Sequence, residues 1–172
     1  MPDILHFRDG AFVADQRHLA PADGDAAAAF DDAIVPLAIW RRNADAGLVL
    51  PAVWVAPSED FSVLRPWAAA LTLVALEFPK AADGRAYSIA SILRSQFGFR
   101  GELRAVGDVQ IDQLFFLRRV GFDSAQLPPK WTNEATLPAI RAALGTFSER
   151  YQGAVDEPLP LFKRRLLGEV AP

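Results

Sequence analysis

Short apolar runs that alternate with helical patterns constrain the fold of this chain more than any other feature. Each run is apolar nearly throughout, which is typical of strands buried on both faces of a parallel sheet. The runs lie at residues 34–40, 48–55, 73–78, 103–106 and 125–127. From residue 48 onward, the pattern therefore predicts a strand followed by a helix, repeated about four times.

Helical patterns lie between these runs. Apolar residues recur at helical spacing over residues 83–97, with Asp83 as a natural N-cap and Gly98 as a natural stop. Residues 108–120 show the same start and stop signals, with an aspartate before the helical pattern and a glycine after it. Two further helices are expected at about residues 59–70 and 133–144.

Repeated βα units predict an α/β fold with a mostly parallel sheet covered by helices. The pattern leaves open whether this sheet is a half-barrel or an open doubly wound sheet. A full eightfold barrel is excluded, because it takes roughly 250 residues and the chain has 172. An N-terminal β-hairpin is expected around Asp9-Gly10, since Asp-Gly between apolar runs is a strong turn signal.

The predicted organisation is a single α/β domain over residues 1–152 and an extended C-terminal arm over residues 153–172. The arm contains Pro158 and Pro160 and has room for one helical turn at residues 161–167. Residues 20–32 are rich in Ala, Asp, Gly and Pro, which predicts a loop or a short helical turn.

Composition excludes several chemistries. The chain has no cysteine, which rules out thiolate catalysis, iron–sulfur clusters and cysteine-rich zinc sites. Its two histidines, His6 and His18, are assigned to the surface, so no metal site is expected. Because no dinucleotide or phosphate-loop glycine motif is found, no cofactor is predicted.

Charge and hydropathy also restrict partners and compartment. A net charge of −3 argues against a nucleic-acid partner. No apolar run reaches the roughly 20 residues of a membrane span, so we expect a cytoplasmic protein with no membrane contact. Several aromatic residues and a short sheet favour a homodimer. Arginine supplies 15 of the 18 basic residues, and its planar fork of donors suits oxyanions.

Ligands of parallel sheets bind beyond the carboxyl ends of the strands, so the loops after residues 78, 106 and 127 are the candidate site. In the first loop, two cations flank the start of a helix, and a tyrosine and a serine add donors. The predicted anion-binding residues are Lys80, Arg85, Tyr87 and Ser88. The plainer alternative is that Asp83 caps the helix, the two cations stay solvated and the tyrosine packs against the core.

Asp108 and Asp112 are the candidate catalytic residues, because a helix would place carboxylates four residues apart on one side. The plainer alternative is that one caps a helix and the other forms an ion pair. Asp83, Arg104 and Gln113 are the expected supporting residues. No nucleophile with its base, and no other catalytic motif, was found, so whether the protein is an enzyme stays open.

Residues 76–127 resemble an uncharacterised bacterial family, number 934 among the domains of unknown function. The resemblance rests on the segments FPK at 78–80, DGR at 83–85, YS at 87–88, GELRA at 101–105, GDV at 107–109, DQL at 112–114 and GFD at 121–123. Members of that family are commonly labelled probable oxidoreductases of sulfite reduction, so the resemblance implies a place in assimilatory sulfate and sulfite reduction.

Three hypotheses follow from the residues and the resemblance together. The first is an accessory protein that binds a sulfur oxyanion metabolite or a partner such as sulfite reductase or a sulfate-activating enzyme. The second is an oxidoreductase that acts directly in sulfite reduction with a diffusible cofactor. The third is a scaffold whose arginine-rich edge and tail are contact surfaces. The first predicts that Arg85→Ala abolishes oxyanion binding and leaves the fold intact.

Overall fold

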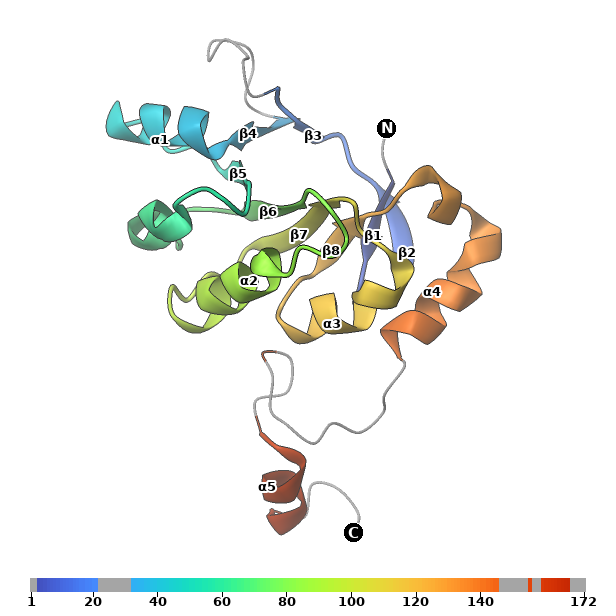
Figure 1. Cartoon of the computed structure of the whole chain (residues 1–172). Helices are drawn as coiled ribbons and strands as arrows, with labels where there is room; N and C mark the ends of the chain where they lie inside the picture. The colour runs from blue at the N-terminus through green and yellow to red at the C-terminus, as the bar shows by residue number, and fades with distance from the viewer. Residues whose placement is uncertain (1–2, 22–31, 146–154, 156–158, 168–172) are drawn as a thin grey trace.

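The computed structural model describes residues 3–21, 32–145, 155 and 159–167. Its described residues form an eight-stranded sheet in the order β2-β1-β8-β7-β6-β5-β4-β3 (Figure 1). The strands are β1 (Asp3–His6), β2 (Ala11–Ala14), β3 (His18–Leu19), β4 (Ala33–Pro36), β5 (Ala52–Val55), β6 (Leu73–Phe78), β7 (Glu102–Gly107) and β8 (Ser124–Gln126). Neighbouring strands from β3 to β8 are parallel, and β1 runs antiparallel to both β2 and β8. The mostly parallel α/β sheet and the N-terminal hairpin are therefore confirmed.

The helices follow the strands in chain order. The α-helices are α1 (Leu37–Asp45), α2 (Arg85–Ser95), α3 (Leu114–Arg119), α4 (Leu137–Leu144) and α5 (Leu161–Leu166). The 3-10 helices are η2 (Phe61–Trp67), η3 (Ile111–Gln113), η4 (Pro129–Trp131) and η5 (Glu134–Thr136). Within the described part of the chain, no helix is both long and apolar enough to cross a bilayer.

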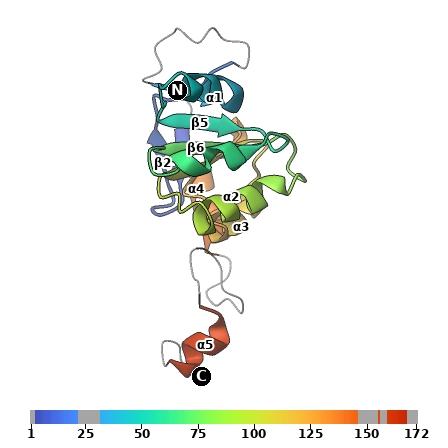
Figure 2. The same cartoon turned by 90° about the vertical axis from the view of Figure 1, so that its left-hand side faces the viewer.

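The sheet is a curled half-barrel, which decides between the two architectures left open by the sequence. Strands β4 to β8 lie side by side in chain order, so every right-handed crossover moves in the same direction and leaves its helix on the same face. Figures 1 and 2 show α2 and α3 together on one side of β6 and β7, and α4 packs against α3 farther along the sheet.

The link between the two edge strands shows how strongly the sheet curls. Four residue steps separate Ala14 of β2 from His18 of β3, and such a link spans at most about 14 Å. In a flat sheet, eight strands would hold these edges about 34 Å apart. The sheet must therefore bend until residues 15–19, the crossing segment, can pass over its concave face.

The two faces of the sheet have different surroundings. Alternate strand residues such as Val74, Leu76 and Leu103 join the helices in the large outer core. The residues between them face inward and form a small cluster of Ile34, Ala52, Leu73, Ala75 and Val106 with Trp54 packed against it. The concave face therefore has a small apolar cluster in place of a second helix layer.

Several local predictions need correction. The run at residues 34–40 is a strand only as far as Pro36, because Leu37, Trp40 and Ala44 fall on one face of a helix and are buried there. The helix expected over residues 108–120 begins only at Ile111, and its first turn is the 3-10 helix η3. The helix expected at about residues 59–70 is the 3-10 helix η2.

The remaining helices lie within their predicted ranges but are shorter. The N-cap of α2 is Gly84 and not the predicted Asp83, and the start of the range 133–144 forms the 3-10 helix η5. Helix α2 spans Arg85–Ser95, α4 ends at Leu144, and α5 occupies the arm (Figure 1). The proposed boundary at residues 152 and 153, and most of the loop expected at residues 20–32, lie outside the described residues.

Candidate functional site

The loops after β6, β7 and β8 meet at one end of the sheet, here called the C-terminal edge. The backbone N–H of Ala81 donates to Oδ2 of Asp108 at 2.9 Å, and Nε2 of Gln113 donates to the Ala81 carbonyl at 2.7 Å. Nζ of Lys130 donates to Oε1 of Gln110 at 3.1 Å. The structure thus brings the three predicted loops together, as the parallel topology requires.

Arg85 is turned toward its own neighbour at this edge. Its Nη2 lies 2.7 Å from Oδ2 of Asp83, and its Nε donates to Oδ1 of Asp83 at 3.0 Å. These hydrogen bonds lower the pKa of Asp83 to about 2 and raise the pKa of Arg85. Lys80 and Ser88 are exposed. Anion binding here stays a prediction, and the arginine proposed for it already holds a carboxylate.

Asp108 and Asp112 do not share a helical turn. Asp108 lies in the loop after β7, where it accepts hydrogen bonds from the Ala81 backbone and the Gln110 side chain. Asp112 is exposed within η3. Tyr87 packs edge-on against Phe78, and burial together with the nearby Asp112 raises the pKa of its hydroxyl. Asp108 thus ties two loops together, and catalysis by the pair stays a prediction.

Arg104 lies away from this edge, on the concave face of β7, and its side chain is only 2% exposed. It donates to Glu102 through Nε and Nη2 and forms an ion pair with Asp15 of the crossing segment. Glu102 also accepts a hydrogen bond from Ser124 of β8. The residue expected to support the edge therefore fastens the crossing segment to the middle of the sheet.

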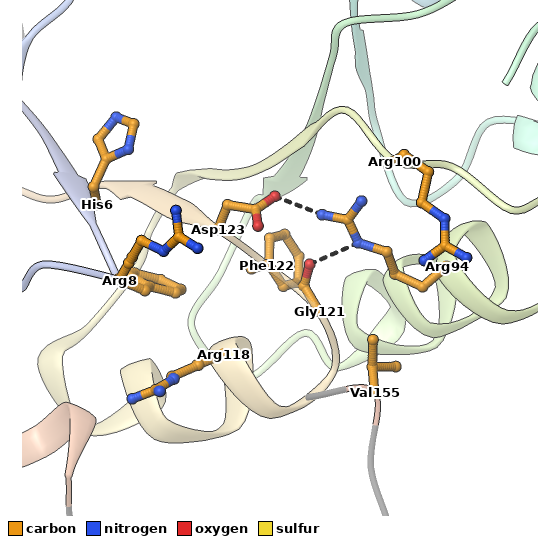
Figure 3. Close-up of a pocket in the computed structure, with 10 residues that line it drawn as sticks. His6, Arg8, Arg94, Arg100, Arg118, Gly121, Phe122, Asp123 and Val155 are labelled. Carbon is orange, nitrogen blue, oxygen red and sulfur yellow. Dashed lines mark hydrogen bonds and ion pairs between the residues drawn. The ribbon is translucent and has the colours of Figure 1, made fainter. Parts of the chain in front are cut away.

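A pocket lies at the opposite end of the strands, here called the N-terminal edge (Figure 3). Its volume is about 660 Å³. The polar side chains that line it, which together define the arginine pocket, are His6, Arg8, Arg94, Arg100, Arg118 and Asp123. Four arginines and one aspartate thus line a single pocket, of the size that small-molecule sites have in proteins.

Arg94 joins several backbone and side-chain groups on one wall of this pocket. Its guanidinium donates to the carbonyls of Phe99, Gly101 and Gly121 at 2.8 to 2.9 Å and forms an ion pair with Asp123 (Figure 3). Burial lowers the pKa of Arg94, while Asp123 works to raise it. Because nearly all its donors are occupied, this arginine is structural and contributes only its charge to a ligand.

The other three arginines are open to the pocket. Arg8 comes from the β1–β2 turn, Arg100 from the loop before β7, and Arg118 from the last turn of α3. All three are exposed, and among the residues that the structure describes none of them forms an ion pair. Their N–H donors, five on each guanidinium, are therefore available to an anion.

Sequence reasoning missed this pocket because its residues come from three separate connections. The rule that ligands bind beyond the carboxyl ends of parallel strands points to the loops after the strands, whereas Arg8 and Arg100 lie on loops at the other edge. His6, assigned to the surface, is half-buried and lines the same pocket. The excess of arginine over lysine was the one available signal. Among the described residues, no three His, Asp or Glu side chains gather as metal ligands.

The fold and this site define an α/β half-barrel protein with a cationic pocket at the N-terminal edge of its sheet. A family model described as "Bacterial protein of unknown function (DUF934)" matches residues 52–162, and the chain belongs to this family. Neither a search of curated proteins nor a search of solved structures found a match. The family assignment confirms the resemblance seen in residues 76–127.

Proposed function

We propose that this protein is an accessory protein of assimilatory sulfate and sulfite reduction that binds a sulfur oxyanion metabolite in its arginine pocket. The pathway in this proposal comes from the resemblance described above. The ligand chemistry comes from one observation: three arginines with no ion-pair partner among the described residues line a single pocket.

The charge of the pocket supports an anionic ligand. Asp123, its only acidic lining residue among those described, is engaged by Arg94, so Arg8, Arg100 and Arg118 have no carboxylate to satisfy them there. Guanidinium groups bind sulfate-like and phosphate-like oxygens through paired N–H donors, and such charge-assisted bonds are about twice as strong as neutral ones. An oxyanion would thus supply the acceptors that this cluster lacks.

The size of the pocket supports a ligand larger than a bare ion. A volume of about 660 Å³ lies in the middle of the range for metabolite sites. Within the sulfur oxyanion class, this favours an activated sulfate anhydride such as adenylyl sulfate over free sulfate or sulfite. The buried ring of Phe122, which also lines the pocket, provides an apolar surface beside the cations.

Calorimetric titration of the purified protein with adenylyl sulfate, sulfate and sulfite tests this proposal. We expect adenylyl sulfate to bind most tightly, and Arg118→Gln to weaken it by about tenfold or more, the loss of one charge-assisted hydrogen-bonding group. Arg42→Gln is the matched control, because Arg42 is an exposed arginine of α1 that does not line the pocket. Equal binding by both variants would remove the pocket from consideration.

The accessory role itself needs a separate test. Co-migration of the protein with sulfite reductase or a sulfate-activating enzyme in native size exclusion is expected, together with the homodimer predicted from the sequence. Migration alone under conditions that saturate the ligand would contradict the partner hypothesis. Direct oxidoreductase activity stays a prediction, tested by whether the purified protein reduces sulfite when it is supplied with a reduced nicotinamide or flavin and no other protein, and loses that turnover in Asp108→Asn.

A further inference from the structure

We propose a second ligand site inside the curl of the sheet, which takes a small organic acid with one carboxylate and a compact apolar body. The site is a cavity between the concave face and the crossing segment, here called the inner cavity. It shares no residue with the arginine pocket. This inference therefore stands independently of the proposed function.

The inner cavity has a volume of about 140 Å³. A cavity of about 150 Å³ in another protein is known to hold benzene, so this one has room for a ligand of about six non-hydrogen atoms. His18 and Leu19 of the crossing segment line it and are exposed, which places an opening beside them. A small solute can enter without unfolding of the sheet.

Arg104 gives the cavity a fixed cationic donor. Its side chain is 2% exposed and lines the cavity from β7. Glu102 and Asp15 occupy Nε and Nη2, whereas Nη1 makes no hydrogen bond with any described residue. Since Nη1 has no such partner and is not completely buried, it keeps a small accessible surface. Nη1 is therefore the Arg104 nitrogen that has no hydrogen-bond partner among the described residues, in a side chain that lines the cavity.

The acids lie behind the arginine. Asp15 and Glu102 contact Arg104, but neither of them lines the cavity. The polar groups that do line it are Arg17, His18, Arg104 and Gln126. Both carboxylates also pair with Arg17, at 3.5 and 3.9 Å, so they orient the two guanidinium groups and offset the cost of burying Arg104. The two arginines and the amide of Gln126 then supply N–H donors to the cavity wall. Such a wall suits an anionic head group.

The opposite wall of the cavity is apolar. Ile4, Ile34 and Val106 line it, and each is only 1% exposed. A fully hydrated inorganic oxyanion would lose water against this wall and gain no hydrogen bond from it. A short carboxylic acid places its charge on Arg104 and its carbon chain on these residues. This division of the wall selects an organic acid over sulfate.

A nuclear magnetic resonance titration tests this inference, with propionate as the probe. The reporter is the indole N–H of Trp54, which donates to the Ala20 carbonyl beside the crossing segment and packs on the inner cluster. We expect propionate to shift this signal. Propionamide, which has the same shape and no charge, should bind about tenfold more weakly or worse, since a charged hydrogen bond is lost.

Two variants assign the binding to this cavity. Arg104→Lys keeps a cation beside Asp15 and Glu102 but removes the Nη1 donor, and we expect a loss of affinity of about tenfold. Gln126→Leu removes a lining amide from β8 and leaves the ion-pair cluster intact, so it decides the question if Arg104→Lys fails to fold. Arg118→Gln, in the arginine pocket, should leave propionate binding unchanged.

Four results would overturn the inference. The first is the absence of any shift with propionate, and the second is equal binding of propionate and propionamide. A third is tighter binding of sulfate than of propionate at the Trp54 reporter, which would refute the organic-acid class. The fourth is weaker propionate binding in Arg118→Gln, which would move the site to the arginine pocket.

Discussion

The two ends of the parallel strands both carry arginines, but only at the N-terminal edge are several of them unpaired among the described residues. At the C-terminal edge, Arg85 is held by Asp83 two residues away, and Asp108 is used to join two loops. At the N-terminal edge, Asp123 engages Arg94, while Arg8, Arg100 and Arg118 face the pocket together. A cationic loop therefore indicates a binding site only where no carboxylate lies within reach.

Helix direction explains why cations gather at the N-terminal edge. In a βα unit, the helix starts at the C-terminal edge and ends at the opposite one, so unpaired backbone carbonyls point to the N-terminal edge. Arg94 lies in the last turn of α2, and Arg118 lies in the last turn of α3. Arginines stabilise these helix ends, and those without further partners remain open to a ligand.

Arg94→Met should have the largest effect, because it removes the group that joins three carbonyls and Asp123. We expect the free energy of unfolding to fall by about 3 kcal/mol, as buried acceptors lose their donors. Urea denaturation measures this change. Arg118→Gln serves as the control and should stay within about 0.5 kcal/mol of the parent. Equal losses in both variants would erase the distinction between structural and free arginines.

Gly121→Ala should come next. Gly121 has a φ of +104°, and a Cβ there would lie 2.7 Å from Cγ of Arg94. We expect destabilisation of about 2 kcal/mol from backbone strain and displacement of the arginine. Gly84→Ala at the C-terminal edge is the matched control, because no atom beyond its chain neighbours lies within 4 Å of the position that a Cβ would take there. Similar unfolding midpoints for the two variants would contradict this prediction.

Ligand affinity should distinguish the N-terminal edge from the C-terminal edge more clearly than the free energy of unfolding does. We expect Arg118→Gln to weaken adenylyl sulfate binding about tenfold, while Arg85→Gln leaves it within about twofold, because Arg85 already holds Asp83. Both affinities can be measured by the same calorimetric titration. The reverse pattern would transfer the site to the C-terminal edge, where the sequence first placed it.

The smallest effect concerns the acid titration of Asp83. Its pKa is lowered from 3.8 to about 2 by hydrogen bonds from Arg85, so the pair stabilises the fold fully above pH 3.8 and loses this contribution as pH falls toward 2. In Arg85→Gln, the carboxyl carbon of Asp83 should titrate closer to 3.8. Carbon-detected magnetic resonance measures both values. An unchanged titration would show that Arg85 is not paired in solution.

Much of the fold could be predicted from local patterns. The apolar run at residues 73–78 corresponds to β6 without change, and the Asp-Gly turn places the hairpin between β1 and β2. The prediction of a strand over all of residues 34–40 was wrong, because periodicity alone does not distinguish a short buried strand from the first turn of a buried helix. Of the candidate site, the sequence correctly predicted which loops meet, but not the ion pair that occupies Arg85.

The sequence by itself determined most of the elements, the repeated βα pattern that predicts a parallel sheet and the excess of arginine, because each depends on composition or on residues close in the chain. Only the tertiary structure decided which arginines face an acid and which face a pocket. Arg104 and Asp15 are 89 residues apart and pair because the sheet curls, and Arg8 lines the same pocket as Arg100 and Arg118 because β1 lies beside β8. Charge pairing acts over a few ångströms of space, so its outcome depends on the topology that folds distant residues together.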